Sequence, residues 1–427
     1  MGKALYILFL KLYSSGIAIA SFFNNKAKLW IKGRHNIFST ISDKLSHTCS
    51  NRIWIHCSSL GEFEQGRPLI ESLKKNYPHY SIILTFFSPS GYEHQKNYQS
   101  ANHIFYLPMD SKKNAQKFFD VVQPRLVIFI KYEFWYYYLS EAKKRKVPLL
   151  LVSATFRKDQ PFFQWYGKFH REMLSCFTHL FVQNRVSLNL LQKINFSNVS
   201  ISGDTRFDRV LEIARNFKPV PGIEKFCAGK TVIVAGSTWL EDDEELDHYA
   251  NAHPDIRFII APHDIGESRL KECEKLYHYS IRYSQFLQQE HKVEVPTFDI
   301  QNRTANTLII DNVGMLKYLY SYAIICYVGG GFGGDGVHNV LEAAVYAKPV
   351  VFGPVYEKYH EAIELIEHGG AFSVIDAIEL EDTLNELFDN PSQCNTAATS
   401  ARDYVYSKAG ATENVMKYIQ EKRLLTN

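Results

Sequence analysis

The strongest constraint on the fold is a repeated alternation of short apolar segments with segments of helical periodicity after residue 50. The first apolar series comprises Ile53–His56, Ser81–Phe87, Ile104–Leu107, Leu126–Ile130, Pro148–Val152, Leu180–Val182 and Val199–Ser202. Helical patterns separate most of them, as in Pro68–Tyr77, where the apolar residues share one face. Apolar strands that alternate with helices are typical of a parallel sheet covered on both faces.

A second alternating series follows a break in the pattern. Its strand candidates are Thr231–Ala235, Phe258–Ala261, Thr307–Asp311, Ile324–Val328 and Pro349–Phe352. The break, Lys218-Pro219-Val220-Pro221-Gly222, has the composition of a linker. Since 427 residues are too many for one compact core, we predict two doubly wound α/β domains, residues 36–217 and 223–408. Such domains bind ligands at the carboxyl ends of their strands, here in a shared cleft, and a last helix within 409–427 is a candidate to cross back.

Composition excludes several classes of protein. A net charge of +3 is too small to indicate nucleic-acid binding. The seven cysteines are scattered and form no C-x-x-C pair, which argues against a disulfide framework and against a zinc site. We therefore expect an ordinary globular protein of a reducing compartment.

The first 35 residues differ from the rest of the chain. Leu5 to Phe23 is almost entirely apolar and would form a helix about 28 Å long, close to the thickness of a bilayer core. Residues 1–50 carry seven lysines and arginines against Asp43 alone, and several of these bases follow the apolar stretch directly. This pattern favours a helix that spans or lies on the cytoplasmic face of a membrane. A signal peptide and a helix docked on the protein are the alternatives.

Residues Val328 to Glu342 combine a buried strand, six glycines and a predicted helix start. Asn339 is predicted to open the helix, with Glu342 as its capping-box partner. A bare backbone before a helix N-terminus forms a site for anions such as phosphate. The run Gly331–Gly336 also fits the dinucleotide pattern G-x-G-x-x-G, although it comes late in the chain. A glycine-rich connection that only lets the helix pack on the sheet is the remaining interpretation.

Three further positions follow strands of the first series. Glu62 comes after the first strand, where it can act as a general base or only stabilise a helix start. Glu133 comes after the fourth strand and has the same two interpretations. Arg206 follows the last strand and offers positive charge to an anion, or it pairs with Asp204 or Asp208.

Two other polar features are weaker candidates. The acidic run at residues 241–245 is predicted to be a solvated helix start, because its charge favours the helix dipole. His338 has no second ligand at a metal-like spacing, and we interpret it as a turn or phosphate-contacting residue. The chain has no D-x-D pair, so no metal site is expected.

Eight segments in this order resemble the 3-deoxy-D-manno-octulosonic acid (Kdo) transferases of lipopolysaccharide synthesis, and the resemblance covers nearly the whole chain. The segments are residues 54–62 (WIHCSSLGE), 85–91 (TFFSPSG), 133–135 (EFW), 203–208 (GDTRFD), 261–263 (APH), 311–314 (DNVG), 338–342 (HNVLE) and 352–354 (FGP). The resemblance implies a GT-B glycosyltransferase with two Rossmann-like domains. It implies CMP-Kdo as donor and the acylated, phosphorylated glucosamine disaccharide precursor of lipid A as acceptor. It also implies an inverting, metal-independent reaction at the cytoplasmic face of the inner membrane.

Residue roles follow from the same resemblance. Glu62 matches the family's catalytic base, and Glu133 and Arg206 match positions that stabilise the transition state. The matched contacts to CMP are Pro262, His263, Val313, Gly314, Met315, Asn339, Val340, Leu341 and Glu342.

Five residues depart from the family pattern. His263 and Arg206 replace an arginine and a lysine, and Met315, Val340 and Val337 replace a glutamate, a proline and a glycine. The departures at His263 and Met315 bear on CMP binding. The alternatives are therefore a GT-B enzyme that uses a UDP- or GDP-sugar, a nicotinamide oxidoreductase built on Gly331–Gly336, and a non-catalytic sugar-binding membrane scaffold.

Overall fold

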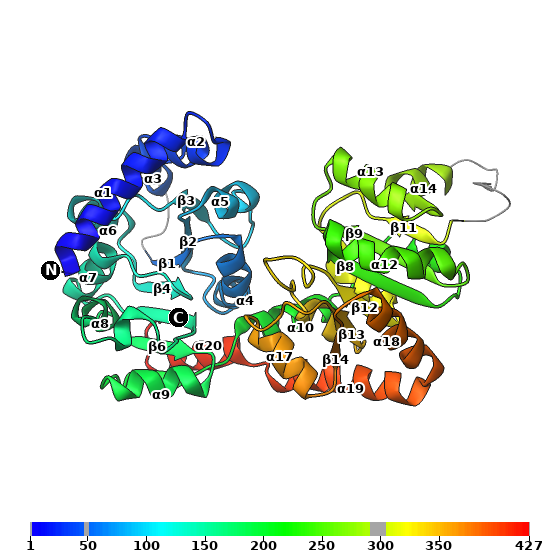
Figure 1. The fold of residues 1–427 in the computed structure, drawn as a ribbon. Coiled ribbons are helices and arrows are strands. Elements are labelled where there is room, and N and C mark those ends of the chain that lie inside the picture. The colour runs from blue at the N-terminus through cyan, green and yellow to red at the C-terminus, as the bar shows by residue number, and fades with distance from the viewer. Residues whose placement is uncertain (1, 47–50, 291–304, 427) are drawn as a thin grey trace. The chain divides into compact units, whose positions relative to one another are not determined.

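The protein consists of two compact units, each built on a seven-stranded parallel sheet (Figure 1). The computed structural model describes residues 2–46, 51–290 and 305–426. Unit 1 contains Met1–Arg209 and Ala409–Asn427, and unit 2 contains Val210–Lys408. The prediction of two parallel-sheet α/β domains is confirmed.

The sheet of unit 1 has the strand order β3-β2-β1-β4-β5-β6-β7. Its strands are β1 (Arg52–Cys57), β2 (Ser81–Phe86), β3 (His103–Tyr106), β4 (Leu126–Ile130), β5 (Leu149–Ala154), β6 (His179–Val182) and β7 (Val199–Ile201). The helices are α1 (Gly2–Ala20), α2 (Asn25–Lys32), α3 (Ile37–Leu45), α4 (Leu60–Asn76), α5 (Pro89–Gln95), α6 (Lys112–Val122), α7 (Tyr136–Lys144), α8 (Lys168–Leu174), α9 (Arg185–Lys193), α10 (Thr205–Arg215) and α20 (Ala411–Glu421). Alternate residues of β1 enter different cores, with Trp54 on one face and Ile53 and Ile55 on the other.

The sheet of unit 2 has the order β10-β11-β9-β8-β12-β13-β14. Its strands are β8 (Val232–Thr238), β9 (Arg257–Pro262), β10 (Ser280–Arg282), β11 (Thr307–Ile309), β12 (Ile325–Val328), β13 (Val350–Phe352) and β14 (Ala371–Ser373). The helices are α11 (Ile223–Cys227), α12 (Leu240–Ala252), α13 (Glu267–Leu276), α14 (Tyr283–Glu290), α15 (Leu316–Leu319), α16 (Leu341–Ala344), α17 (His360–Glu367), α18 (Ala377–Asp389) and α19 (Pro391–Ser407).

The chain passes between the units twice. The first passage lies within α10, between Arg209 and Val210, rather than at the predicted linker 218–222. That linker is bonded to unit 2, since the Val220 amide donates to the Tyr322 hydroxyl at 2.9 Å. After the second passage, α20 packs on α4 and inserts Val415 into a core of unit 1.

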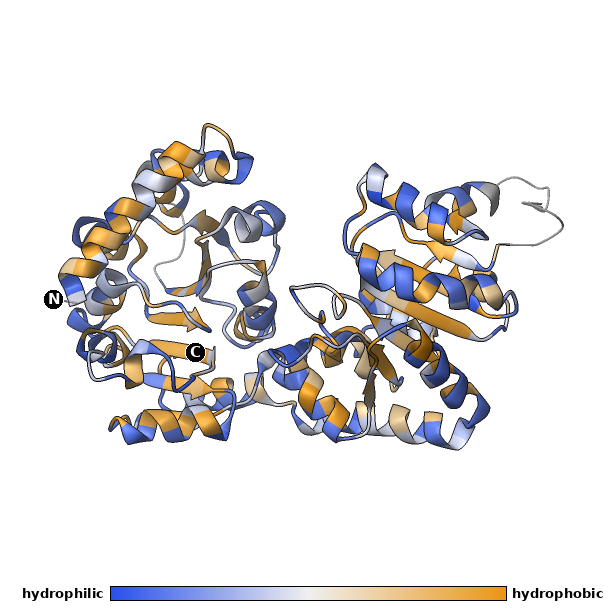
Figure 2. Ribbon diagram, in the orientation of Figure 1, coloured by the Kyte–Doolittle hydropathy of each residue, from blue (hydrophilic) through white to orange (hydrophobic). Residues whose placement is uncertain are grey.

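Helix α1 is held to unit 1 along one side and exposes an apolar surface on the other. Tyr6 donates to Asp110 Oδ2 at 2.7 Å, and Tyr13 contacts the ring of Trp30. By contrast, Leu8 and Leu12 are 52% and 64% exposed, and Figure 2 shows α1 as a largely hydrophobic helix at the margin of unit 1. Its length and composition are sufficient for a membrane span, and it is only 6% buried. Docking on the protein and contact with a membrane are therefore compatible in this helix.

Candidate active site

Glu62 lies in the first turn of α4, immediately beyond the carboxyl end of β1. Its Oε2 accepts hydrogen bonds from the Ser59 amide, at 3.0 Å, and from the Ser59 hydroxyl. Ser59 is the N-cap of α4, so the two residues form a capping box that fixes the carboxylate. Glu62 Oε1 has no hydrogen-bond partner among the residues that the structure describes, and the side chain is partly exposed. Glu62 thus stabilises the helix start through one carboxylate oxygen only.

Glu133 is held next to a histidine of β1. His56, completely buried, places its Nε2 3.3 Å from Glu133 Oε2 and 3.3 Å from Trp135 Nε1. Its Nδ1 lies 3.1 Å from the carbonyl oxygen of Thr85, which can only accept. A neutral His56 therefore carries its proton on Nδ1 and accepts from Trp135, whereas a protonated His56 can donate to Glu133. No role was predicted for His56, because its place in an apolar strand gives no sign of this contact.

Arg206 forms an ion pair with Asp204 at the start of α10. Its Nε donates to Asp204 Oδ2 at 2.8 Å, and its amide donates to Asp204 Oδ1 at 2.9 Å. Asp204 also accepts from Gln65 of α4 at 3.2 Å, which ties Arg206 to the helix that carries Glu62. Asp208 instead accepts from the amides of Gly410 and Thr412, both at 2.6 Å, and so holds the start of α20. Arg206 therefore pairs with Asp204, one of its two predicted carboxylate partners.

The two glutamates share one electrostatic environment at the carboxyl end of β1. Burial raises the pKa of the Cys57 thiol, and the charges of Glu62 and Glu133 raise it further. Both carboxylates are therefore within electrostatic reach of the last residue of β1. At this end of the strand, Glu62 has one carboxylate oxygen without a hydrogen bond to the described residues, which suits proton abstraction from a bound hydroxyl group.

The glycine-rich turn of unit 2 is shaped largely by contacts inside the protein. Gly330 has φ of +92°, and a Cβ on Gly331 would lie 2.5 Å from the Gly353 nitrogen. The Gly330 amide donates to Asp242 Oδ2 at 2.8 Å. The predicted anion site is thus already occupied at Gly330 by the Asp242 carboxylate of the protein itself. At Gly334, by contrast, an added Cβ would meet nothing within 4 Å.

The expectation that residues 241–245 form a solvated helix start is wrong for two of them. Asp242 and Asp243 are both fully buried. Asp242 accepts from the Tyr327 hydroxyl at 2.9 Å in addition to Gly330, and Asp243 pairs with Arg269. Burial raises the pKa of both carboxyl groups, that of Asp243 to about 6. Asp242 therefore ties α12 to the glycine-rich turn.

The predicted helix start at Asn339 also needs correction. Helix α16 begins at Leu341 and has four residues. Asn339 Nδ2 donates to Glu342 Oε1 at 3.1 Å, so the two side chains bond each other instead of forming a reciprocal capping box. Val340 and Leu341 are fully buried, so their side chains are not available to a ligand.

Three aromatic side chains form a compact group where strands of unit 2 end. Trp239 Nε1 donates to His338 Nε2 at 3.0 Å, and their rings are inclined by only 15°. His263 stacks on both rings, with centroid distances of 4.5 Å to each. Burial, together with the neighbouring His263, lowers the pKa of His338 to about 4. His338 is therefore neutral at pH 7 and offers a phosphate no positive charge, while His263 is exposed.

The other predicted donor contacts lie in the same unit. Pro262 ends β9 next to His263. The segment Val313-Gly314-Met315 follows β11, where Val313 is 81% exposed and Gly314 has φ of +99°. An exposed loop with a glycine in this conformation leaves its backbone accessible, which fits contacts made by main-chain atoms.

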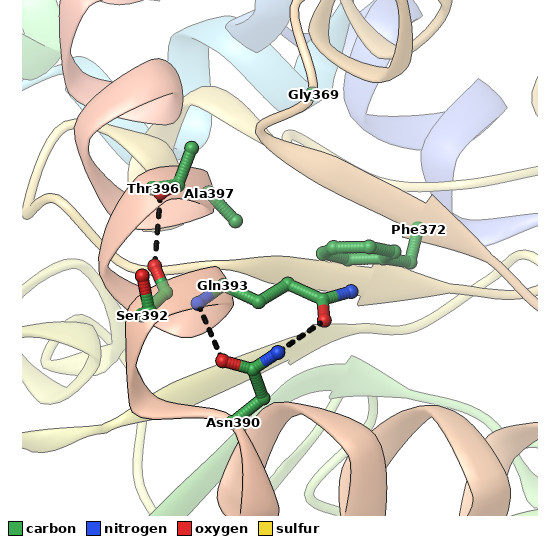
Figure 3. Close-up of a pocket in the computed structure, with 7 residues that line it drawn as sticks. All are labelled: Gly369, Phe372, Asn390, Ser392, Gln393, Thr396 and Ala397. Carbon is green, nitrogen blue, oxygen red and sulfur yellow. Dashed lines mark hydrogen bonds between the residues drawn. The ribbon is translucent and has the colours of Figure 1, made fainter.

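A separate cavity of about 400 Å³ in unit 2 lies among Gly369, Phe372 and residues of α19 (Figure 3). Two of its polar residues bond each other: the backbone N–H of Gln393 donates to Asn390 Oδ1, and Asn390 Nδ2 donates to Gln393 Oε1. No ionisable side chain lines it. Among the described residues, no group of three or more His, Cys, Asp or Glu side chains is placed to hold a metal ion.

Comparison with solved structures supports the fold. A putative UDP-N-acetylglucosamine 2-epimerase from Listeria monocytogenes superposes with a TM-score of 0.61 at 12% identity, over 88% of this chain and 97% of its own. A glycosyltransferase from Rickettsia africae gives a TM-score of 0.55 at 16% identity, over 88% of this chain and 99% of its own. The chain has the GT-B fold of two Rossmann-like domains.

Comparison with known sequences supports the family. The sequence profile of 3-deoxy-D-manno-octulosonic-acid transferase (kdotransferase) matches residues 32–209. The 3-deoxy-D-manno-octulosonic acid transferase of Aquifex aeolicus is 26% identical over 346 residues, 79% of this chain and 86% of its own. That of Haemophilus influenzae is 23% identical over 387 residues, 86% of each chain. Together with the fold and with the motifs at the carboxyl ends of the strands, these matches support the Kdo transferase family of glycosyltransferases for this chain.

Proposed function

We propose that this protein transfers Kdo from CMP-Kdo to the acylated, phosphorylated glucosamine disaccharide precursor of lipid A, with inversion at the transferred sugar. The observation that carries the proposal is the geometry of Glu62. One oxygen is fixed by Ser59 at the end of β1, and the other has no partner in the described parts of the chain. A carboxylate fixed in this way can take the proton from an acceptor hydroxyl as that oxygen attacks the Kdo carbon.

Glu133 and Arg206 stabilise the charges that develop in this step. Glu133, backed by His56, supplies negative charge to the cationic character of the sugar in the transition state. Arg206 is partly exposed and is oriented by Asp204. It provides positive charge for the carboxylate of Kdo or for the departing phosphate.

The donor nucleotide binds to unit 2 in this proposal. Its contacts in this proposal are Pro262, His263, Val313, Gly314, Met315, Asn339, Val340, Leu341 and Glu342. Glu342 accepts hydrogen bonds from the ribose hydroxyls, and Asn339 contacts the phosphate. CMP leaves with a single phosphate, so we propose that turnover needs no metal ion, and EDTA is expected to leave the rate unchanged.

The N-terminal helix places the enzyme at its lipid substrate. We propose that α1, with its exposed apolar side and the bases that follow it, binds the cytoplasmic face of the inner membrane. Resistance to salt extraction combined with release by detergent would support this localisation, and release by salt alone would contradict it.

Donor specificity separates this proposal from another GT-B activity. CMP, UDP and GDP are titrated into the purified protein in a competition assay with labelled CMP. Preferential displacement by CMP supports Kdo transfer. Tighter binding of UDP or GDP would favour a different nucleotide sugar, and nucleotide binding without turnover would favour a sugar-binding scaffold.

A further inference from the structure

A second cavity, of about 550 Å³, lies in unit 1 between α1 and the helices that follow it. It is lined by Ser14 of α1, Trp30 of α2, Phe38 of α3, Lys117 of α6 and Arg34 of the turn after α2. Its volume is in the range of small-molecule binding sites. None of the residues given a role in sugar transfer lines it.

The charge of this cavity is positive and uncompensated. Arg34 and Lys117 line it, and no carboxylate does. Arg34 donates to the backbone carbonyls of Trp30, Phe87 and Leu107 at 2.7–3.1 Å, but it has no ion-pair partner among the described residues. Burial lowers its pKa to about 9, so the guanidinium stays protonated at neutral pH. A bound anion would supply the missing negative charge.

An unsatisfied donor lies in the same wall. The indole of Trp30 stacks against the guanidinium of Arg34, 3.8 Å from the ring centroid. Its Nε1 is buried and has no hydrogen-bond acceptor in the described residues. Buried indole N–H groups ordinarily have a partner. An oxygen of a bound anion would provide the acceptor that the fold lacks.

Apolar groups complete the site. Ile37, Phe38 and Met109 also line the cavity. Ser14 of α1 lies in the wall of the same cavity. A ligand that fits both parts therefore has an anionic head and an apolar portion that packs on these side chains.

We propose that this cavity binds the phosphate group of an acylated lipid, with Arg34 and Lys117 as its cations and Trp30 Nε1 as a neutral donor. The proposal does not depend on which sugar the protein transfers. The phosphate belongs either to a bilayer phospholipid or to a phosphorylated glycolipid, and the two sources present the same chemistry to these three residues.

The test measures binding of short-chain lipids to the full chain in a non-ionic detergent. The probes are dioctanoyl phosphatidic acid, dioctanoylglycerol, which lacks the phosphate, and inorganic phosphate, each followed by titration calorimetry. Trp30→Phe removes the indole donor and keeps an aromatic ring beside Arg34. Lys117→Gln removes one cation, and Lys113→Gln is its control, because Lys113 is an exposed lysine of the same helix outside the cavity lining. Unchanged thermal unfolding without lipid establishes that each variant is folded.

We expect Trp30→Phe and Lys117→Gln each to weaken binding of phosphatidic acid at least fivefold, and Lys113→Gln to change it less than twofold. The same titrations with the phosphorylated glucosamine disaccharide identify the source of the phosphate, as the lipid whose affinity falls in these variants. The proposal would be overturned if neither lipid's affinity responded to Trp30→Phe or Lys117→Gln. Equal binding of dioctanoylglycerol, or inorganic phosphate binding as tightly as the lipid, would also overturn it.

Discussion

Glu62 caps the start of α4 and is the proposed general base, and substitution can separate these two functions. Glu62→Gln keeps an oxygen that accepts from the Ser59 amide, and glutamine is the alternative residue at this position of a capping box. We therefore expect its free energy of unfolding to stay within about 0.5 kcal/mol of the wild type. Glutamine cannot accept the proton of the acceptor hydroxyl. Loss of a general base lowers turnover about 10²- to 10⁴-fold, or about 2.7–5.4 kcal/mol of transition-state stabilisation.

Ser59→Ala is the matched structural control. It removes the hydroxyl that bonds Glu62 and keeps the carboxylate. Loss of an N-cap side chain costs about 0.5–2 kcal/mol of stability. We expect Ser59→Ala to unfold at a lower denaturant concentration but to lose less than tenfold in turnover. The assays are urea unfolding and transfer of Kdo to the lipid precursor at saturating donor.

Two results would refute the assignment of Glu62 as the general base. If Glu62→Gln kept more than a tenth of the wild-type turnover, Glu62 would not be the base. If Ser59→Ala lost as much turnover as Glu62→Gln while remaining folded, the carboxylate would act mainly through the start of α4.

Three further predictions concern other parts of the molecule. Gly331→Ala should cost about 1–3 kcal/mol of stability, because its Cβ would clash with backbone, whereas Gly334→Ala should be neutral in thermal unfolding. A turnover loss confined to Gly334→Ala would indicate that a ligand approaches this residue. Burial raises the pKa of Asp110 to about 6, above its value of about 3.9 in an unfolded chain. Its protonation therefore stabilises the fold below pH 4, and this contribution is lost as the pH rises through 6; Asp110→Asn should flatten that part of the stability profile in denaturant titrations. Leu8→Glu with Leu12→Glu should leave stability unchanged, since both side chains are exposed, but should abolish cosedimentation with anionic vesicles; unchanged cosedimentation would exclude this face of α1 as the membrane contact.

The sequence predicted the central strands better than the edges. All seven strands of unit 1 were predicted, each within two residues of its observed bounds. The two missed strands, β10 and β14, have three residues each and lie at the edges of the second sheet. Edge strands are short and partly exposed, so Ser280–Arg282 and Ala371–Ser373 lack the continuous apolar pattern that marks a buried strand.

In the candidate site, too, some residues could be predicted from the sequence and others could not. Glu62 and Glu133 were predicted as site residues because a residue that follows a parallel strand lies at the ligand-binding end of the sheet. The contact of His56 with Glu133 and the stacking of His263 on Trp239 depend on side chains from different strands, which local sequence patterns do not encode. Asp242 was misread for the same reason, since its partners Tyr327 and Gly330 lie more than 80 residues away in the chain.

The most direct test of the account is a mass measurement on the lipid product. Purified protein in detergent is mixed with freshly generated CMP-Kdo and the tetra-acylated disaccharide precursor, beside the Glu62→Gln variant and a known Kdo transferase. We predict that the wild-type protein adds the mass of one or more Kdo units to the lipid and that Glu62→Gln does not. An unchanged lipid in the wild-type reaction, with the donor intact and the known enzyme active, would contradict the proposed reaction.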